Sequence, residues 1–174
     1  MTTMMRLLTL TLVVVAAATA ATSAVAQSDA ACTGAQLKGT FNAVRGSAGA
    51  GNITYKLVLK NVSTHMCTLT GLPQGRLLGK TGKALPTHVR AASPGMLTAI
   101  LVRLAPGKTT FATARFSPDV PGTGEPTAGT KCEPTAWWFR VTGQGGGTTK
   151  VKLGPPTPVC EHGQLLFSGY SQKS

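Results

Sequence analysis

The clearest pattern in the chain is an alternation of large apolar residues with mostly polar ones. It runs from Ile53 to Lys60, and its apolar members are Ile53, Tyr55, Leu57 and Leu59. A period of two residues is typical of a β-strand that buries one face and exposes the other. The sequence therefore predicts a strand over this segment.

Further short segments have strand character. They are Leu37 to Val44, Met66 to Thr70, Gly75 to Leu78, Leu97 to Leu104, Thr109 to Phe116, Ala136 to Val141, Thr149 to Leu153 and Gln164 to Ser168. Turns rich in glycine and proline separate them, and no long segment has a helical period. Many short strands at this spacing favour two packed antiparallel sheets, so we predict an all-β fold, an antiparallel β-sandwich.

The alternation also predicts which side chains face the core. In the strand ending at Phe116, the inward residues are Thr110, Ala112, Ala114 and Phe116; in a later strand they are Trp137, Phe139 and Val141. Trp138 and Arg140 then share the opposite face. A tryptophan beside a cation there suits a carbohydrate or stacking surface, although partial cover by a loop is the commoner arrangement.

The N-terminal segment has the features of a signal peptide. One basic residue, Arg6, precedes the apolar run Leu7 to Ala18, and small residues lead to Ala24-Val25-Ala26. We predict cleavage before Gln27, which leaves 27–174 as one secreted domain after a signal peptide at 1–26. A permanent membrane anchor is the alternative, but its second half is weakly apolar and no basic cluster follows it.

The composition is strongly basic. Lys and Arg number 17 against 5 Asp and Glu, a formal net charge of +12. These cations are scattered singly along the chain, with no dense run and no recognisable nucleic-acid module, so we predict no specific nucleic-acid binding. Two interpretations stay open: a solvated surface that keeps the protein soluble, or attraction to an anionic polymer of the cell envelope.

Four cysteines, Cys32, Cys67, Cys132 and Cys160, follow the leader. An even count in an exported domain predicts two disulfides, but spacing cannot choose among the three possible connectivities. A zinc site is the alternative, because His65-x-Cys67 and Cys160-x-His162 supply a tetrahedral ligand set. An oxidising compartment competes for the thiolates, so we predict disulfides, no metal and no cofactor.

The sequence offers no catalytic motif. It contains no Gly-x-Ser-x-Gly, His-Glu-x-x-His or phosphate-binding Gly-x-x-x-x-Gly-Lys-Ser/Thr pattern. The acids fall mostly in predicted loops or beside cysteines, and they are Asp29, Asp119, Glu125, Glu133 and Glu161. We therefore expect a protein that is not an enzyme, with a cryptic hydrolase as a remote alternative.

Several motifs in order resemble a known family. Cys32-Thr33-Gly34-Ala35-Gln36-Leu37, Tyr55 to Ser63, Cys67-Thr68-Leu69-Thr70-Gly71-Leu72-Pro73, Leu104-Ala105-Pro106-Gly107, Cys132-Glu133-Pro134 and Phe139-Arg140-Val141 resemble secreted actinobacterial four-cysteine domains of unknown function. The resemblance spans about Cys32 to Ser168, and the chain departs from it at Leu72, where an aromatic residue is common. It implies an immunoglobulin-like sandwich, export, and disulfides Cys32–Cys67 and Cys132–Cys160. It implies no reaction.

Together these observations predict an exported, non-catalytic β-sandwich domain of uncharacterised function. We expect it to be secreted or associated with the cell wall, and to bind an anionic envelope polymer or an exported partner protein through its basic surface. A structural or antigen-like secreted domain without a specific ligand is the alternative. Nothing in the sequence indicates the oligomeric state.

Overall fold

The computed structural model describes residues 29–96, 100–127 and 131–172, and the predicted signal peptide lies outside them. Its strands are β1 (Leu37–Ala43), β2 (Ile53–Asn61), β3 (Cys67–Leu69), β4 (Gln74–Leu78), β5 (His88–Ala91), β6 (Val102–Leu104), β7 (Thr109–Phe116), β8 (Ala136–Thr142), β9 (Thr148–Thr157) and β10 (Gln164–Phe167). The short helical turns are η1 (Gly34–Gln36), η2 (Pro94–Met96) and α1 (Cys160–Gly163). The prediction of an all-β fold is confirmed.

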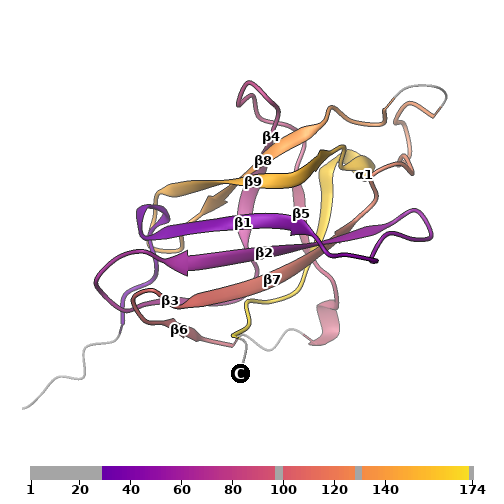
Figure 1. The fold of residues 1–174 in the computed structure, drawn as a ribbon. Coiled ribbons are helices and arrows are strands. Elements are labelled where there is room, and N and C mark those ends of the chain that lie inside the picture. Colours follow the sequence, from indigo (N-terminus) through magenta and orange to yellow (C-terminus); the bar gives the residue numbers. More distant parts are fainter. Residues whose placement is uncertain (1–28, 97–99, 128–130, 173–174) are drawn as a thin grey trace, which may run out of the picture.

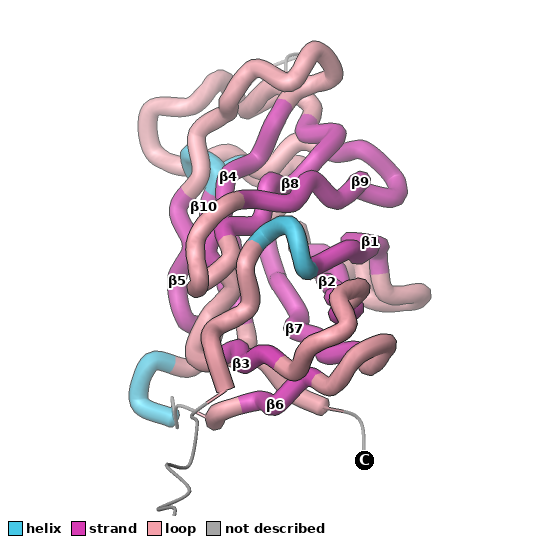
Figure 2. The backbone as a smooth tube through the Cα atoms, turned by 90° about the vertical axis from the view of Figure 1, so that its left-hand side faces the viewer, coloured by secondary structure: helices cyan, strands magenta, loops and turns pink. Residues whose placement is uncertain are grey.

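The strands form one large curled sheet. Its order is β4-β8-β9-β1-β2-β7-β10-β5, and β3 and β6 form a separate two-stranded ladder. Figures 1 and 2 both place this ladder on the side of the molecule away from β4, β8 and β9. At the two ends of the sheet, the segment that leads into β5 returns to β4, where the Leu85 N–H donates to the Leu77 carbonyl at 2.9 Å. The sheet thus approaches a closed barrel.

This architecture corrects the predicted two-sheet antiparallel sandwich. Strand β1 pairs antiparallel with β2 along its whole length, and it also pairs parallel with β9 at Phe41↔Leu153. One strand therefore joins the halves that would otherwise pack as two sheets. Strands β5 and β10 form a second parallel pair. Parallel pairing between distant segments leaves no mark on the alternation of residues, which is why the sequence pattern did not predict it.

The barrel interior holds a cluster of aromatic rings, all of them buried: Phe41, Tyr55, Phe116, Phe139 and Phe167. The ring centroids of Phe41 lie 5.5 Å from those of Tyr55 and Phe139, the spacing of favourable edge or tilted contacts. The predicted inward set Thr110, Ala112, Ala114 and Phe116 is confirmed by burial, as are Phe139 and Val141.

Trp137 differs from its prediction. It is only half-buried, because the register of β8 against β9 shifts between Ala136 and Trp138. Such an irregularity turns a side chain away from the position that strict alternation would give it. Lys80 Nζ lies over the Trp137 ring, 5.3 Å from its centroid.

Two disulfides, Cys32–Cys67 and Cys132–Cys160, form in the structure. This is the connectivity that the family resemblance implies. Cys67 and Cys160 belong to different disulfides, so they do not assemble the alternative zinc ligand set. The first bond ties the segment before β1 to β3, and the second ties the loop before β8 to α1.

Several strand limits differ from those predicted from the sequence. Strand β5 was not predicted, β9 extends beyond Leu153 to Thr157, and β6 is shorter than the predicted Leu97 to Leu104, part of which lies outside the described residues. Within the part of the chain that the structure describes, no helix is long and apolar enough to cross a membrane.

Candidate anion-binding surface

Strand register brings scattered cations of the sequence into line. On the outer face of the barrel, Arg76 of β4 lies directly opposite Arg140 of β8, and Arg140 lies directly opposite Lys150 of β9. On the neighbouring strands β1 and β2, Lys38 lies directly opposite Lys60. Five neighbouring strands thus each contribute one cation.

The parallel contact between β1 and β9 joins these two groups. Phe41 pairs with Leu153 and Asn42 with Gly154, and this register, continued three residues back along each strand, brings Lys38 level with Lys150. The two segments also lie close together before β1 begins, because the Gly34 N–H donates to the Gly146 carbonyl at 2.9 Å. Arg76, Arg140, Lys150, Lys38 and Lys60 therefore form one line across the strands, which we call the cation row. At a strand spacing of about 4.8 Å, it extends over roughly 19 Å.

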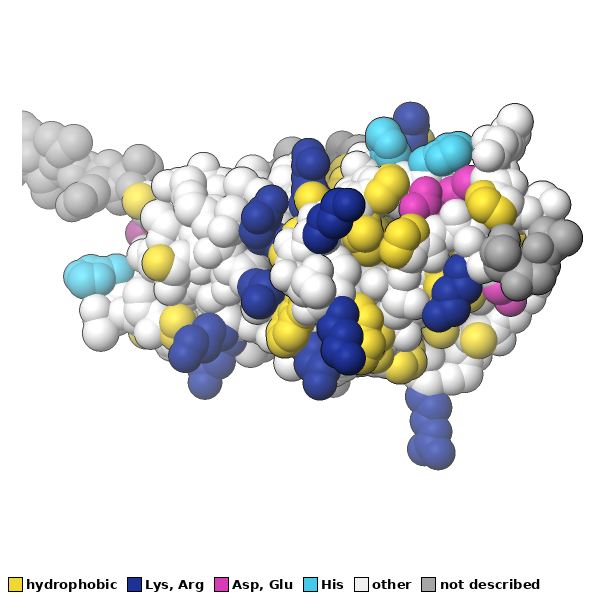
Figure 3. Space-filling view, turned by 90° about the horizontal axis from the view of Figure 1, so that it is seen from above, with side chains coloured by type: hydrophobic (Ala, Val, Ile, Leu, Met, Phe, Trp, Pro, Cys, Tyr) yellow, Lys and Arg dark blue, Asp and Glu magenta, His cyan; other side chains and the backbone are white. Residues whose placement is uncertain are grey.

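The members of the cation row are exposed, and within the described ranges none of them forms an ion pair with an acid. Among the residues that the structure describes, the ion pairs join Arg103 to Asp29, and His162 to Glu125 and Glu133. Figure 3 shows Lys and Arg side chains gathered across the middle of the barrel face, whereas most of the visible acids lie towards one end. Like charges directly opposite each other destabilise a sheet, so the row is unfavourable for folding alone.

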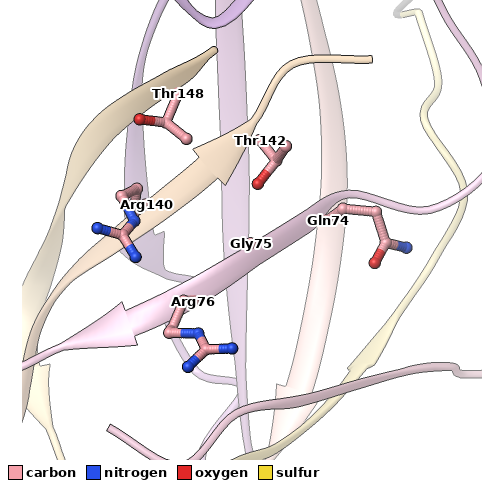
Figure 4. A pocket seen from close by; sticks show the side chains of 6 residues that line it. All are labelled: Gln74, Gly75, Arg76, Arg140, Thr142 and Thr148. Atoms are coloured by element: carbon pink, nitrogen blue, oxygen red, sulfur yellow. The ribbon is translucent and has the colours of Figure 1, made fainter. Parts of the chain in front are cut away.

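Two shallow cavities lie along the row. The larger, of about 450 Å³, is lined by Gln74, Gly75, Arg76, Arg140, Thr142 and Thr148. Figure 4 shows the guanidinium groups of Arg76 and Arg140 projecting from neighbouring strands beside it. The smaller, of about 330 Å³, includes Lys38 and Lys60. Both cavities therefore combine cations with exposed polar or apolar groups on the same outer face.

Glycine at position 75 allows β4 to approach β8 closely. A Cβ at this position would lie 2.4 Å from the Arg140 carbonyl oxygen and 2.7 Å from Cζ of Phe139. Real side chains do not tolerate such distances, so any larger residue would push the strands apart. Gly75 thus fits the β4–β8 pairing in which Arg76 lies opposite Arg140.

The two sides of the row differ in chemistry. On one side, Gln74, Thr142 and Thr148 occupy directly opposite positions and offer amide and hydroxyl groups. On the other side, Trp138 lies opposite Lys152, and the Nζ of Lys150 lies 4.5 Å from the centroid of the Trp138 ring. The prediction that Trp138 and Arg140 share an outer face is consistent with this arrangement.

A second charged cluster lies around α1 and is internally satisfied. The buried Glu125 carboxylate accepts hydrogen bonds from the backbone N–H groups of Gly122 (2.6 Å), Glu161 (2.9 Å) and His162 (2.5 Å). Glu161 and His162 both have a φ of 56°, a left-handed conformation that is uncommon for residues other than glycine. Glu125 thus clamps a strained turn next to the Cys132–Cys160 disulfide.

The pKa values in this cluster follow from the same contacts. Burial alone would raise the pKa of Glu125, but the backbone donors and nearby His162 outweigh it and hold the pKa below its usual range. Burial raises the pKa of Glu133, and the negative charge of Glu125 adds to the effect. The carboxylates of Glu125 and Glu133 and a ring nitrogen of His162 lie within 4.8 Å of one another, but Glu125 already has three donors. We assign this cluster to the fold.

The family of the chain is shown by a match that covers most of its length. A family model described as "Domain of unknown function (DUF4232)" matches residues 32–167, which is most of the chain. The chain belongs to the DUF4232 family. Searches of curated proteins and of solved structures find no match to it. For this DUF4232 domain, the features that point to a function lie on its outer surface.

Proposed function

We propose that this protein is an exported, non-catalytic domain that binds an anionic polymer of the cell envelope on the cation row. One observation carries the proposal: five neighbouring strands each place an exposed cation in the same line, with no acid among them. Repulsion across a sheet opposes folding, and an anionic ligand would remove it. A charge that served only solubility would not need this alignment.

The place of action is part of the proposal. Two disulfides suit an oxidising compartment outside the cytoplasm, and the predicted signal peptide at 1–26 would deliver the domain there. We therefore propose a secreted domain that is retained at the cell wall by its ligand. An actinobacterial source, which the family resemblance implies, belongs to the same proposal.

Sedimentation with isolated envelope material tests the function. The purified oxidised protein should pellet with envelope at low salt and be released at high salt, because salt screens attraction between exposed charges. Retention that does not change with salt, or no retention at low salt, would contradict the proposal.

A matched pair of variants locates the binding surface. The triple variant Arg76→Gln, Arg140→Gln, Lys150→Gln should lose about 100-fold in affinity, if each contact contributes roughly 1 kcal/mol as basic residues do near anionic surfaces. The control Lys80→Gln, Lys83→Gln, Lys108→Gln removes the same charge from exposed positions outside the row. Equal losses in the two variants would show that net charge, and not the row, determines binding.

A further inference from the structure

We propose that the ligand of the cation row is a phosphodiester-linked polymer, and that Arg76 and Arg140 form its phosphate subsite. This inference rests on the proposed function and specifies its chemistry. The kind of cation changes along the row. Both residues at its β4–β8 end are arginines, whereas its other three members are the lysines Lys150, Lys38 and Lys60.

Two opposite guanidinium groups suit a phosphate better than a carboxylate. Each guanidinium presents five N–H donors in a planar fork, and the two oxygens of a planar carboxylate match a single fork in its plane. A phosphodiester carries its charged oxygens on a tetrahedral centre, so forks from two sides can share them. Arg76 and Arg140 project from directly opposite positions over the larger cavity, as Figure 4 shows.

Neutral donors beside the arginines strengthen the assignment. The hydroxyls of Thr142 and Thr148 and the amide of Gln74 line the same cavity. All three side chains are exposed, and in the described part of the chain none of them makes a side-chain hydrogen bond. They are free to donate to oxygens of the phosphate or of the groups that link phosphates.

The length and curvature of the row point to a chain. A single phosphate would contact two cations and leave Lys38 and Lys60, three and four strands from β4, without a role. Lipid head groups lie in a plane, but the row crosses strands that curl towards a barrel. A flexible polymer with repeated phosphates can follow that curve, with further phosphates at the lysines.

Trp138 supplies the adjoining apolar contact. Lys150 Nζ now rests on its ring at 4.5 Å. A phosphate at Lys150 would draw the ammonium away from the half-buried Trp138 ring, and the carbon atoms between phosphates could then pack on the ring face that the ammonium leaves. Binding should therefore change the fluorescence of Trp138.

The decisive experiment compares two polymers of equal charge number. Poly(glycerol phosphate) should bind the oxidised protein about tenfold more tightly than polygalacturonate at the same ionic strength, and the variant Arg76→Lys, Arg140→Lys should lose that preference while keeping its charge. The control Arg45→Lys, Arg90→Lys changes exposed arginines outside the row and should keep the preference. Thermal unfolding of each variant checks that the fold is intact.

The outcomes separate this inference from the proposed function. Equal affinity for the two polymers, or a preference that survives in the Arg76→Lys, Arg140→Lys variant, overturns the phosphate subsite but leaves salt-dependent polyanion binding intact. Tighter binding to a single-stranded oligothymidylate or to phosphatidylglycerol vesicles overturns the assignment to an envelope polymer. In a Trp137→Phe variant, an unchanged Trp138 emission at saturating poly(glycerol phosphate) contradicts the polymer contact with the ring.

Discussion

The cation row and the cluster around Glu125 differ in whether their charges have partners within the protein. In the cluster, a buried carboxylate is surrounded by three backbone donors and a histidine. In the row, like charges lie opposite each other at the surface with no counter-charge. Charge that is satisfied inside the protein stabilises the fold, whereas charge left unsatisfied at the surface is available to a ligand. Variants in the two regions should therefore have opposite effects on stability and binding.

The largest effect on stability is expected at the disulfide beside the Glu125 cluster. The variant Cys132→Ala, Cys160→Ala opens a loop of 28 residues, and the chain-entropy relation gives a loss of roughly 3.5 kcal/mol in the free energy of unfolding. Urea denaturation measures it. Polyanion affinity under folding conditions should stay within about twofold of the parent, because the row lies on other strands; a collapse of affinity in the folded variant would contradict the separation of the two regions.

Removing the charge of the clamp should have the next largest effect. Glu125→Gln replaces an acceptor of three backbone N–H groups, and hydrogen bonds to charged groups contribute about 1.5 to 3 kcal/mol, so we expect a loss of about 2 kcal/mol. Asp119→Asn makes the same charge change at an exposed site and serves as the control in the same denaturation series. Equal stability of the two variants would contradict the clamp.

The clamp should also make stability depend on pH. Because the folded pKa of Glu125 is lowered, its contribution is present above the ordinary glutamate pKa of about 4.3 and is lost as the pH falls through the folded value. Glu133, whose pKa is raised, works in the opposite direction: its contribution is present below the unfolded pKa and is lost as the pH rises through the folded one. Thermal unfolding between pH 3 and 7 should show a steeper acid loss in the parent than in Glu125→Gln, and parallel curves would refute the assignment.

The smallest effect has the opposite sign. Arg140→Gln removes the central charge of three directly opposite cations, so the domain should gain about 0.5 kcal/mol of stability while its polyanion affinity falls. Denaturation and binding measured on one preparation check both changes. A variant that lost stability would show that Arg140 is part of the fold, and the contrast with Glu125 would disappear.

The sequence predicted the local structure better than the surface. Alternation along one strand places Tyr55 inside and Lys60 outside, so most strands and the core could be read from it. The cation row depends on register between strands far apart in the chain, above all the parallel β1–β9 contact, which alternation does not encode. Glu125 lies in a loop as predicted, but its burial was not predicted, because its partners are backbone groups and leave no sequence signal. The disulfide pairing came only from the resemblance to a family.

The bridging position of β1 has a consequence for when the protein becomes competent. The cations at positions 38, 60, 76, 140 and 150 come from both halves of the chain, and their two groups join into one row only when β1 lies between β2 and β9. An unfolded or truncated chain can keep much of the same net charge without presenting the row. Since pairings between such distant segments form slowly, we expect the proposed polymer to distinguish the folded domain from an incompletely folded chain of the same net charge.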